Sequence, residues 1–151
     1  MDSNAFWEGI YANKALWAIL VSTVIAQGLK IVTGLIMTKR FNFYWLLGTG
    51  GMPSAHSAAV TSLVVCVNKE LGSASPIFAM TLLFALITMF DAQTWRRSIG
   101  MQAKILNKMM EDIHTKKKIK EDRLRELVGH SPIEVLIGIL VGVAVTFFFY
   151  Y

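Results

Sequence analysis

Four long apolar segments, separated by polar stretches, decide what this chain can fold into. They run from Ala15 to Met37, Ser54 to Asn68, Pro76 to Ala92 and Pro132 to Tyr150. A helix needs about 20 apolar residues to cross a bilayer core, so the second segment is short for a full crossing. Hydrophobic residues make up 54% of the 151 residues, too many for a soluble domain of this length. We therefore expect an all-α integral membrane helical bundle of about four transmembrane helices.

Three of these segments begin with sharp helix-start signals. Ser54 follows Pro53, and Ser75-Pro76 and Ser131-Pro132 each place an N-cap hydroxyl before a proline at the first helical position. No internal repeat and no second domain are evident. The sequence thus predicts a single membrane-embedded domain over residues 1–151.

Two further stretches have the pattern of interfacial amphipathic helices. One is short and aromatic, with Phe6, Trp7, Ile10 and Tyr11 at helical spacing. The other spans Ser98 to Ile113, and we expect it to lie along the membrane surface. Its apolar residues step by four and three and form one apolar face, which consists of Ile99, Ala103, Leu106, Met110 and Ile113.

The basic residues gather on one predicted side of the membrane. Four crossings place the loops 38–53 and 93–131 on the same side, and these loops hold most of the fifteen Lys and Arg residues: 39, 40, 96, 97, 104, 108, 116, 117, 118, 120, 123 and 125. By the positive-inside rule this side is cytoplasmic. We expect a multi-pass protein of the cell (inner or plasma) membrane, with no nucleic-acid partner.

Two histidines occupy matching positions on this side. His56 lies at the first turn of the second segment, and His130 lies just before the fourth. A helix N-terminus presents free N–H groups and the positive end of the helix dipole, which together bind anions such as phosphate. Taken one at a time, each histidine is more simply explained as a packing or loop residue. Together they indicate one anion site between two helix starts.

The motifs around these histidines resemble a known superfamily. Pro53-Ser54-Ala55-His56 is similar to the Pro-Ser-Gly-His motif of the type 2 phosphatidic acid phosphatases, which share their site with the vanadium haloperoxidases. The stretch from Gly129 to Leu136 resembles the superfamily's final motif, where Asp follows His by four residues and this chain has Glu134. The combination, over roughly residues 30–142, looks like the small divergent branch found in bacteria and plants.

The resemblance implies a role for each matching position in a phosphatase-like domain. His130 would attack phosphorus, and His56 would protonate the leaving group and then activate water. Glu134 would orient His130, or would only cap its own helix, since Ser131 and Glu134 also form a capping-box pattern. No metal and no other cofactor is implied. The residues expected to contact the substrate on this side are Lys30, Arg40, Ser54, Asp91, Arg96 and Arg97.

Two of these assignments have alternatives. Lys30 lies inside the first segment, where an ionisable side chain either serves a site or extends to the interface as an anchor. Asp91 lies at the end of the third segment. It is either a partner of Arg96 or Arg97 or a plain interfacial carboxylate.

These patterns predict a metal-independent lipid phosphate phosphatase acting on a membrane phospholipid of the phosphatidylglycerophosphate or phosphatidic acid type. The alternatives are a polyprenyl diphosphate phosphatase and a catalytically inactive lipid-binding scaffold, in which Ala55 and Glu134 mark lost chemistry. A transporter or channel subunit is least favoured, because polar residues within the segments are scarce. Four spans leave a thin wall around a site, which is compatible with a homo-oligomer.

Overall fold

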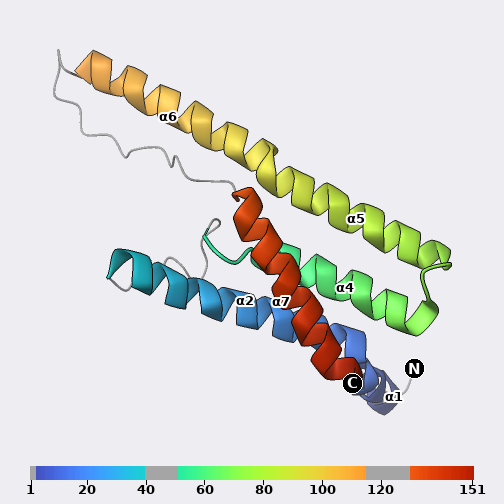
Figure 1. Ribbon diagram of the computed structural model, residues 1–151. Coiled ribbons are helices and arrows are strands. Elements are labelled where there is room, and N and C mark those ends of the chain that lie inside the picture. The colour runs from blue at the N-terminus through green and yellow to red at the C-terminus, as the bar shows by residue number, and fades with distance from the viewer. Residues whose placement is uncertain (1–2, 40–50, 115–129) are drawn as a thin grey trace.

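The computed structural model describes residues 3–39, 51–114 and 130–151, and every regular element in these ranges is an α-helix. The predicted all-α class is therefore confirmed. The four apolar segments form α2, α4, α5 and α7 (Figure 1). The bounds of the six described helices are α1 Ser3–Ala12, α2 Lys14–Thr38, α4 Ala55–Leu71, α5 Pro76–Gln93, α6 Trp95–His114 and α7 Pro132–Tyr150.

The three predicted helix starts are confirmed. Ser54, Ser75 and Ser131 all have extended backbone and accept a hydrogen bond from an N–H of the first helical turn. These hydroxyls satisfy N–H groups that have no partner within the helix. The starts of α4, α5 and α7 are consequently fixed by local chemistry.

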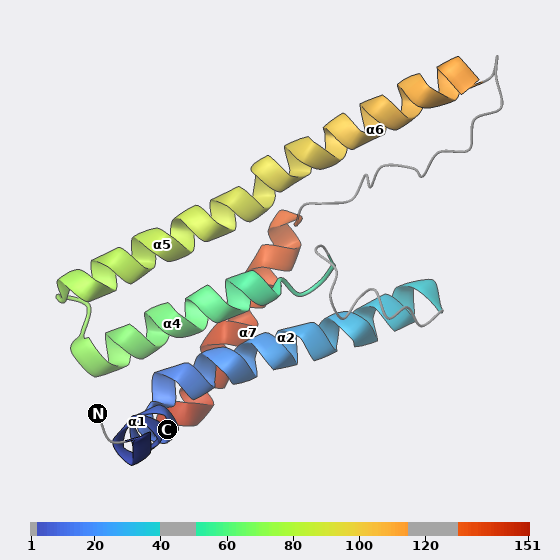
Figure 2. The same cartoon turned by 180° about the vertical axis from the view of Figure 1, so that it is seen from behind.

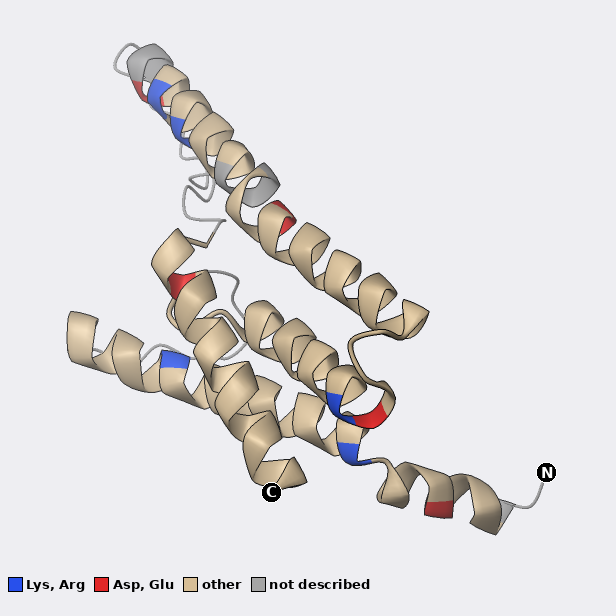
Figure 3. Cartoon of the chain, turned by 45° about the vertical axis from the view of Figure 1, so that its right-hand side comes forward, with Lys and Arg blue, Asp and Glu red and all other residues tan. Residues whose placement is uncertain are grey.

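Three helical stretches in the described part of the chain are long and apolar enough to cross a membrane. They are Lys14–Thr38, Pro76–Glu111 and Pro132–Tyr150. Helix α4 has only 17 residues, and its full crossing stays a prediction. Figure 3 shows Lys, Arg, Asp and Glu mainly near helix ends and on α6, as expected when the middle of a helix lies in hydrocarbon.

Helix α4 is the centre of the bundle. It packs against α2, α5 and α7, and α2 also packs against α7 (Figure 2). A short helix surrounded by other helices does not have to span the whole bilayer core, because protein rather than lipid covers it.

The contact between α4 and α7 depends on two glycines of α7. A Cβ added at Gly138 would lie 2.4 Å from the carbonyl oxygen of Ser54, and one added at Gly142 would lie 2.4 Å from that of Ala58. One turn further on, the hydroxyls of Ser62 and Thr146 lie 2.8 Å apart. Small residues let helix backbones approach closely where lipid provides no hydrophobic force between helices.

The interior of the bundle is built from small side chains. Helix α2 buries Ala18, Ser22, Ala26 and Lys30, which recur every fourth residue on one face. Large apolar side chains point outward instead, as on α5, where those of Leu83, Phe84 and Phe90 are more than half exposed. This distribution is expected of a membrane protein, in which lipid rather than water surrounds the outer face.

Helix α6 differs from the prediction in its direction. It follows α5 after Thr94 alone and continues the line of α5 (Figures 1 and 2) instead of turning aside. Of its apolar stripe, Ala103 is buried, whereas Ile99 and Leu106 are 51% and 48% exposed. The remaining buried positions of the middle of α6 are Gly100 and Asn107. The protein thus leaves two large side chains of this apolar face uncovered.

We predict that Gly142→Ala destabilises the protein by about 1–3 kcal/mol, because its methyl group would collide with the backbone of α4. Gly28→Ala is the matched control. Gly28 also lies in a helix, but an added Cβ there meets no atom within 4 Å. It should be neutral or stabilising by about 0.5–1 kcal/mol. Thermal unfolding of the purified variants in detergent checks both, and equal effects would contradict the described contact.

Candidate functional site

The two histidines lie side by side. The ring centroids of His56 and His130 are 6.5 Å apart, and the ring planes are inclined by 60°. His56 is exposed in the first turn of α4, whereas His130 is only 4% exposed at the start of α7. The predicted proximity of the two imidazoles is thus confirmed. An atom placed between two rings at this separation can contact both of them.

Backbone hydrogen bonds hold the start of α7 against two other helices. The N–H of His130 donates to the carbonyl oxygen of Ala92 in the last turn of α5 at 3.1 Å. The N–H of Ser54 donates to the carbonyl oxygen of Glu134 at 2.9 Å, which joins the start of α4 to the first turn of α7. Both histidines are therefore positioned by main-chain contacts as well as by helix packing.

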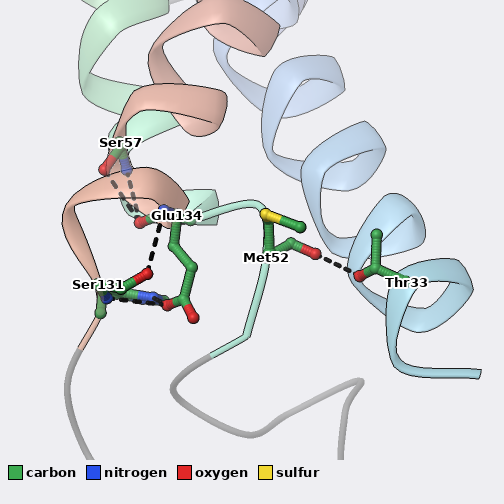
Figure 4. A network of polar contacts seen from close by, with 7 residues as sticks. Thr33, Met52, Ser57, Ser131 and Glu134 are labelled. Carbon is green, nitrogen blue, oxygen red and sulfur yellow. Dashed lines mark hydrogen bonds and ion pairs between the residues drawn. The ribbon is translucent and has the colours of Figure 1, made fainter. Parts of the chain in front are cut away.

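Glu134 both caps its own helix and contacts His130, the two roles that its sequence pattern left open. Its Oε2 accepts the N–H of Ser131 at 3.2 Å, completing a capping box, and lies 2.8 Å from Nδ1 of His130. Figure 4 shows Glu134 turned back toward Ser131 at the start of α7. An ionised carboxylate only accepts hydrogen bonds, so the proton of a neutral His130 ring lies on Nδ1. Its Nε2 is then the basic nitrogen.

Helix α2 contributes a buried cation next to the segment that leads into α4. Lys30 is 6% exposed, and a Cβ added at Gly51 would lie 3.1 Å from its Cε. Gly51 has φ +92°, a conformation that favours glycine. Beside it, Thr33 Oγ1 donates to the carbonyl oxygen of Met52 (Figure 4). Lys30 thus lies in the bundle interior and is not an exposed anchor.

The other predicted contact residues have different positions. Asp91 is half-buried in the last turn of α5, next to the residue that holds His130. Ser54 is fully buried, and its hydroxyl accepts from the N–H and the hydroxyl of Ser57, so in this conformation it fixes the start of α4. Arg40 and the side chains of Arg96 and Arg97 lie outside the described residues.

Two features of the site were not predicted from the sequence. Ala92 acts through its backbone carbonyl, for which a sequence gives no signal. Gly51 adjoins Lys30. Its position in the chain, shortly before Pro53 and His56, was the signal that could have identified it as part of the site. Within the described ranges, no three His, Cys, Asp or Glu side chains are grouped as metal ligands.

Comparison with known proteins covers nearly the whole chain. The model of the Divergent PAP2 family matches residues 11–145, which include both histidines. The chain is 38% identical over 148 residues to the "Uncharacterized membrane protein YuiD" of Bacillus subtilis (strain 168), across 91% of this chain and 94% of that protein. No solved structure matches the chain.

We predict that Glu134→Ala releases the imidazole of His130, so that its neutral form becomes a mixture of the two tautomers. Ser131→Ala is the control, because it removes one capping bond, at a cost of about 1 kcal/mol, and leaves the bond from Glu134 to His130 in place. Nitrogen-15 NMR of the histidine ring in detergent measures the tautomers. A wild-type His130 protonated on Nε2 when neutral would contradict the described geometry.

Proposed function

The chain belongs to the Divergent PAP2 family, and on that premise we propose that its histidine pair hydrolyses a phosphomonoester of a membrane lipid. The single observation that most supports this proposal is the separation of 6.5 Å between the two ring centroids, with Glu134 bound to Nδ1 of one ring. One ring can then act as nucleophile while the other transfers protons.

In the proposed reaction, Nε2 of His130 attacks phosphorus and the bond from phosphorus to the lipid oxygen breaks. His56 in its protonated form donates a proton to that leaving oxygen, which yields the lipid alcohol and a phosphohistidine. A water molecule then attacks phosphorus while His56 takes up one of its protons. The bond from phosphorus to nitrogen breaks, and phosphate leaves with both histidines restored.

The starts of α4 and α7 supply the proposed phosphate site with positive potential. Each helix N-terminus carries roughly half of an elementary charge, and the two starts are joined by the hydrogen bond from Ser54 to Glu134. Lys30 would add a full charge from α2. We further propose Arg40, Arg96 and Arg97 as ligands of the phosphoryl oxygens, with Asp91 as a partner of the arginines.

The bond from Glu134 to His130 favours an active enzyme over an inactive scaffold. Glutamate is one methylene longer than the aspartate of the motif that it resembles, yet its carboxylate lies 2.8 Å from Nδ1. The departure at this position therefore does not by itself remove the orienting contact. A scaffold would bind phospholipid without turnover, and that outcome remains the alternative.

The proposed substrate is a phospholipid of the phosphatidylglycerophosphate or phosphatidic acid type, with a polyprenyl diphosphate as the second candidate. The outward-facing large apolar side chains suit a protein that meets its substrate in the bilayer. We propose that the described helices form one phosphatase-like domain in the cell (inner or plasma) membrane, with the histidines on the cytoplasmic side. A homo-oligomer would thicken the wall of this small bundle.

We expect purified protein in detergent to release phosphate from phosphatidic acid or phosphatidylglycerophosphate without a divalent ion. His130→Ala should lose this activity entirely, and His56→Ala should lower it by about 10²–10⁴-fold. Asn68→Ala, an exposed change at the far end of α4, should leave it unchanged. Activity that survives His130→Ala, or that requires a divalent ion, would refute the mechanism.

The orientation is tested by cysteine labelling in intact cells. In a Cys66→Ala background, Lys118→Cys should react with an impermeant maleimide only after the cells are opened, because residue 118 lies in the basic loop. Asn4→Cys, near the opposite end of the bundle, should react from outside. The reverse pattern would place the histidines on the outer face.

A further inference from the structure

Thr61 differs from the other threonines of the described helices. In the seven others, at positions 23, 33, 38, 81, 88, 94 and 146, Oγ1 lies within 3.1 Å of a carbonyl oxygen one turn earlier in the chain. Thr61 is 7% exposed, and its Oγ1 has no hydrogen-bond partner among the described residues. Thr61 therefore lacks the contact with its own helix that the other threonines have.

A buried hydroxyl without a partner is unfavourable, above all inside a membrane bundle, where neither lipid nor bulk water can satisfy it. The usual remedy in a protein interior is an ordered water that bonds several such groups. The position of Thr61 thus points to a small polar ligand.

Polar groups of α2 and α4 lie near this position, and α7 packs closely against it. Ala58 precedes Thr61 by three residues on α4, and its carbonyl oxygen lies 3.5 Å from Ser22 Oγ of α2, at the limit of a direct hydrogen bond. On the α7 side, a Cβ added at Gly142 would lie 3.0 Å from the Cβ of Thr61 and 2.4 Å from the carbonyl oxygen of Ala58. Thr61 therefore packs against α7, one turn from the point where α4 meets α2.

We propose that Thr61 binds a buried water molecule at this junction. The water would accept from Oγ1 of Thr61 and donate to the Ala58 carbonyl oxygen. It would also donate to Ser22 Oγ, whose own proton is directed to the carbonyl oxygen of Ile19 at 2.9 Å. It would join α2, which carries Lys30, to α4, which carries His56. This inference does not depend on the proposed phosphatase activity.

The consequence is a hydrated contact in the interior of the bundle. Toward the histidines, the next polar pair along α4 is Ser57 and Ser54, whose hydroxyls lie 3.0 Å apart. Toward the other end, Ser62 and Thr146 lie 2.8 Å apart. A water at Thr61 would complete a column of polar contacts between these two pairs.

The proposal is tested first by thermal unfolding in detergent. Thr61→Val has nearly the same shape without the hydroxyl and should lower the unfolding midpoint by roughly 2–4 °C, while Thr61→Ser should stay close to wild type. Thr88→Val on α5 is the matched control, since Thr88 bonds only to its own helix, and it should shift the midpoint less than Thr61→Val does. A midpoint that Thr61→Val leaves unchanged or raises would overturn the proposal.

The second measurement uses wild-type protein and does not depend on a variant that folds. Solid-state NMR in lipid bilayers should show rapid magnetisation transfer from water to Thr61, and none to Thr88. If water reaches Thr61 no faster than Thr88, the proposal fails whatever the unfolding data show, and the hydroxyl of Thr61 then bonds to its own helix as the other threonines do.

Discussion

The close approach of α7 to α4 is the contact on which the candidate site depends. Gly138 and Gly142 let the backbone of α7 rest against the carbonyl oxygens of Ser54 and Ala58. Because both helices begin at the same end of the bundle, this contact brings their N-termini together. The imidazoles of His56 and His130 become neighbours as a result, although 73 residues separate them in the chain.

Two helix N-termini held side by side have an electrostatic cost that bears on function. Their positive dipole ends repel, and the buried Lys30 adds to the same potential. The carboxylate of Glu134 offsets part of it from within the first turn of α7. An anion bound between the two starts would offset more. The fold is thus arranged so that a phosphate group would stabilise it, a property that either an enzyme or a phospholipid-binding scaffold could use.

Much of the helical framework could be predicted from the sequence, because hydropathy and serine caps act locally. The starts at Ser54, Ser75 and Ser131 are examples. The inner face could not be predicted in the same way, since lipid accepts large apolar side chains and packing selects small ones. Leu106 is therefore half exposed, while the buried positions of the core include Ser22, Ser62 and Thr146. Hydropathy does not identify these hydroxyl side chains as core residues. The arginine positions remain predictions.

The central claim is that two helix starts share one anion, and phosphate titration followed by NMR of both imidazoles tests it most directly. As inorganic phosphate is added to the protein in detergent, the ring signals of His56 and His130 should shift together and yield a single dissociation constant. His114, which lies in a charged stretch of the sequence far from both motifs, should not follow that curve. Signals that respond with different affinities, or only one that responds, would contradict a shared site.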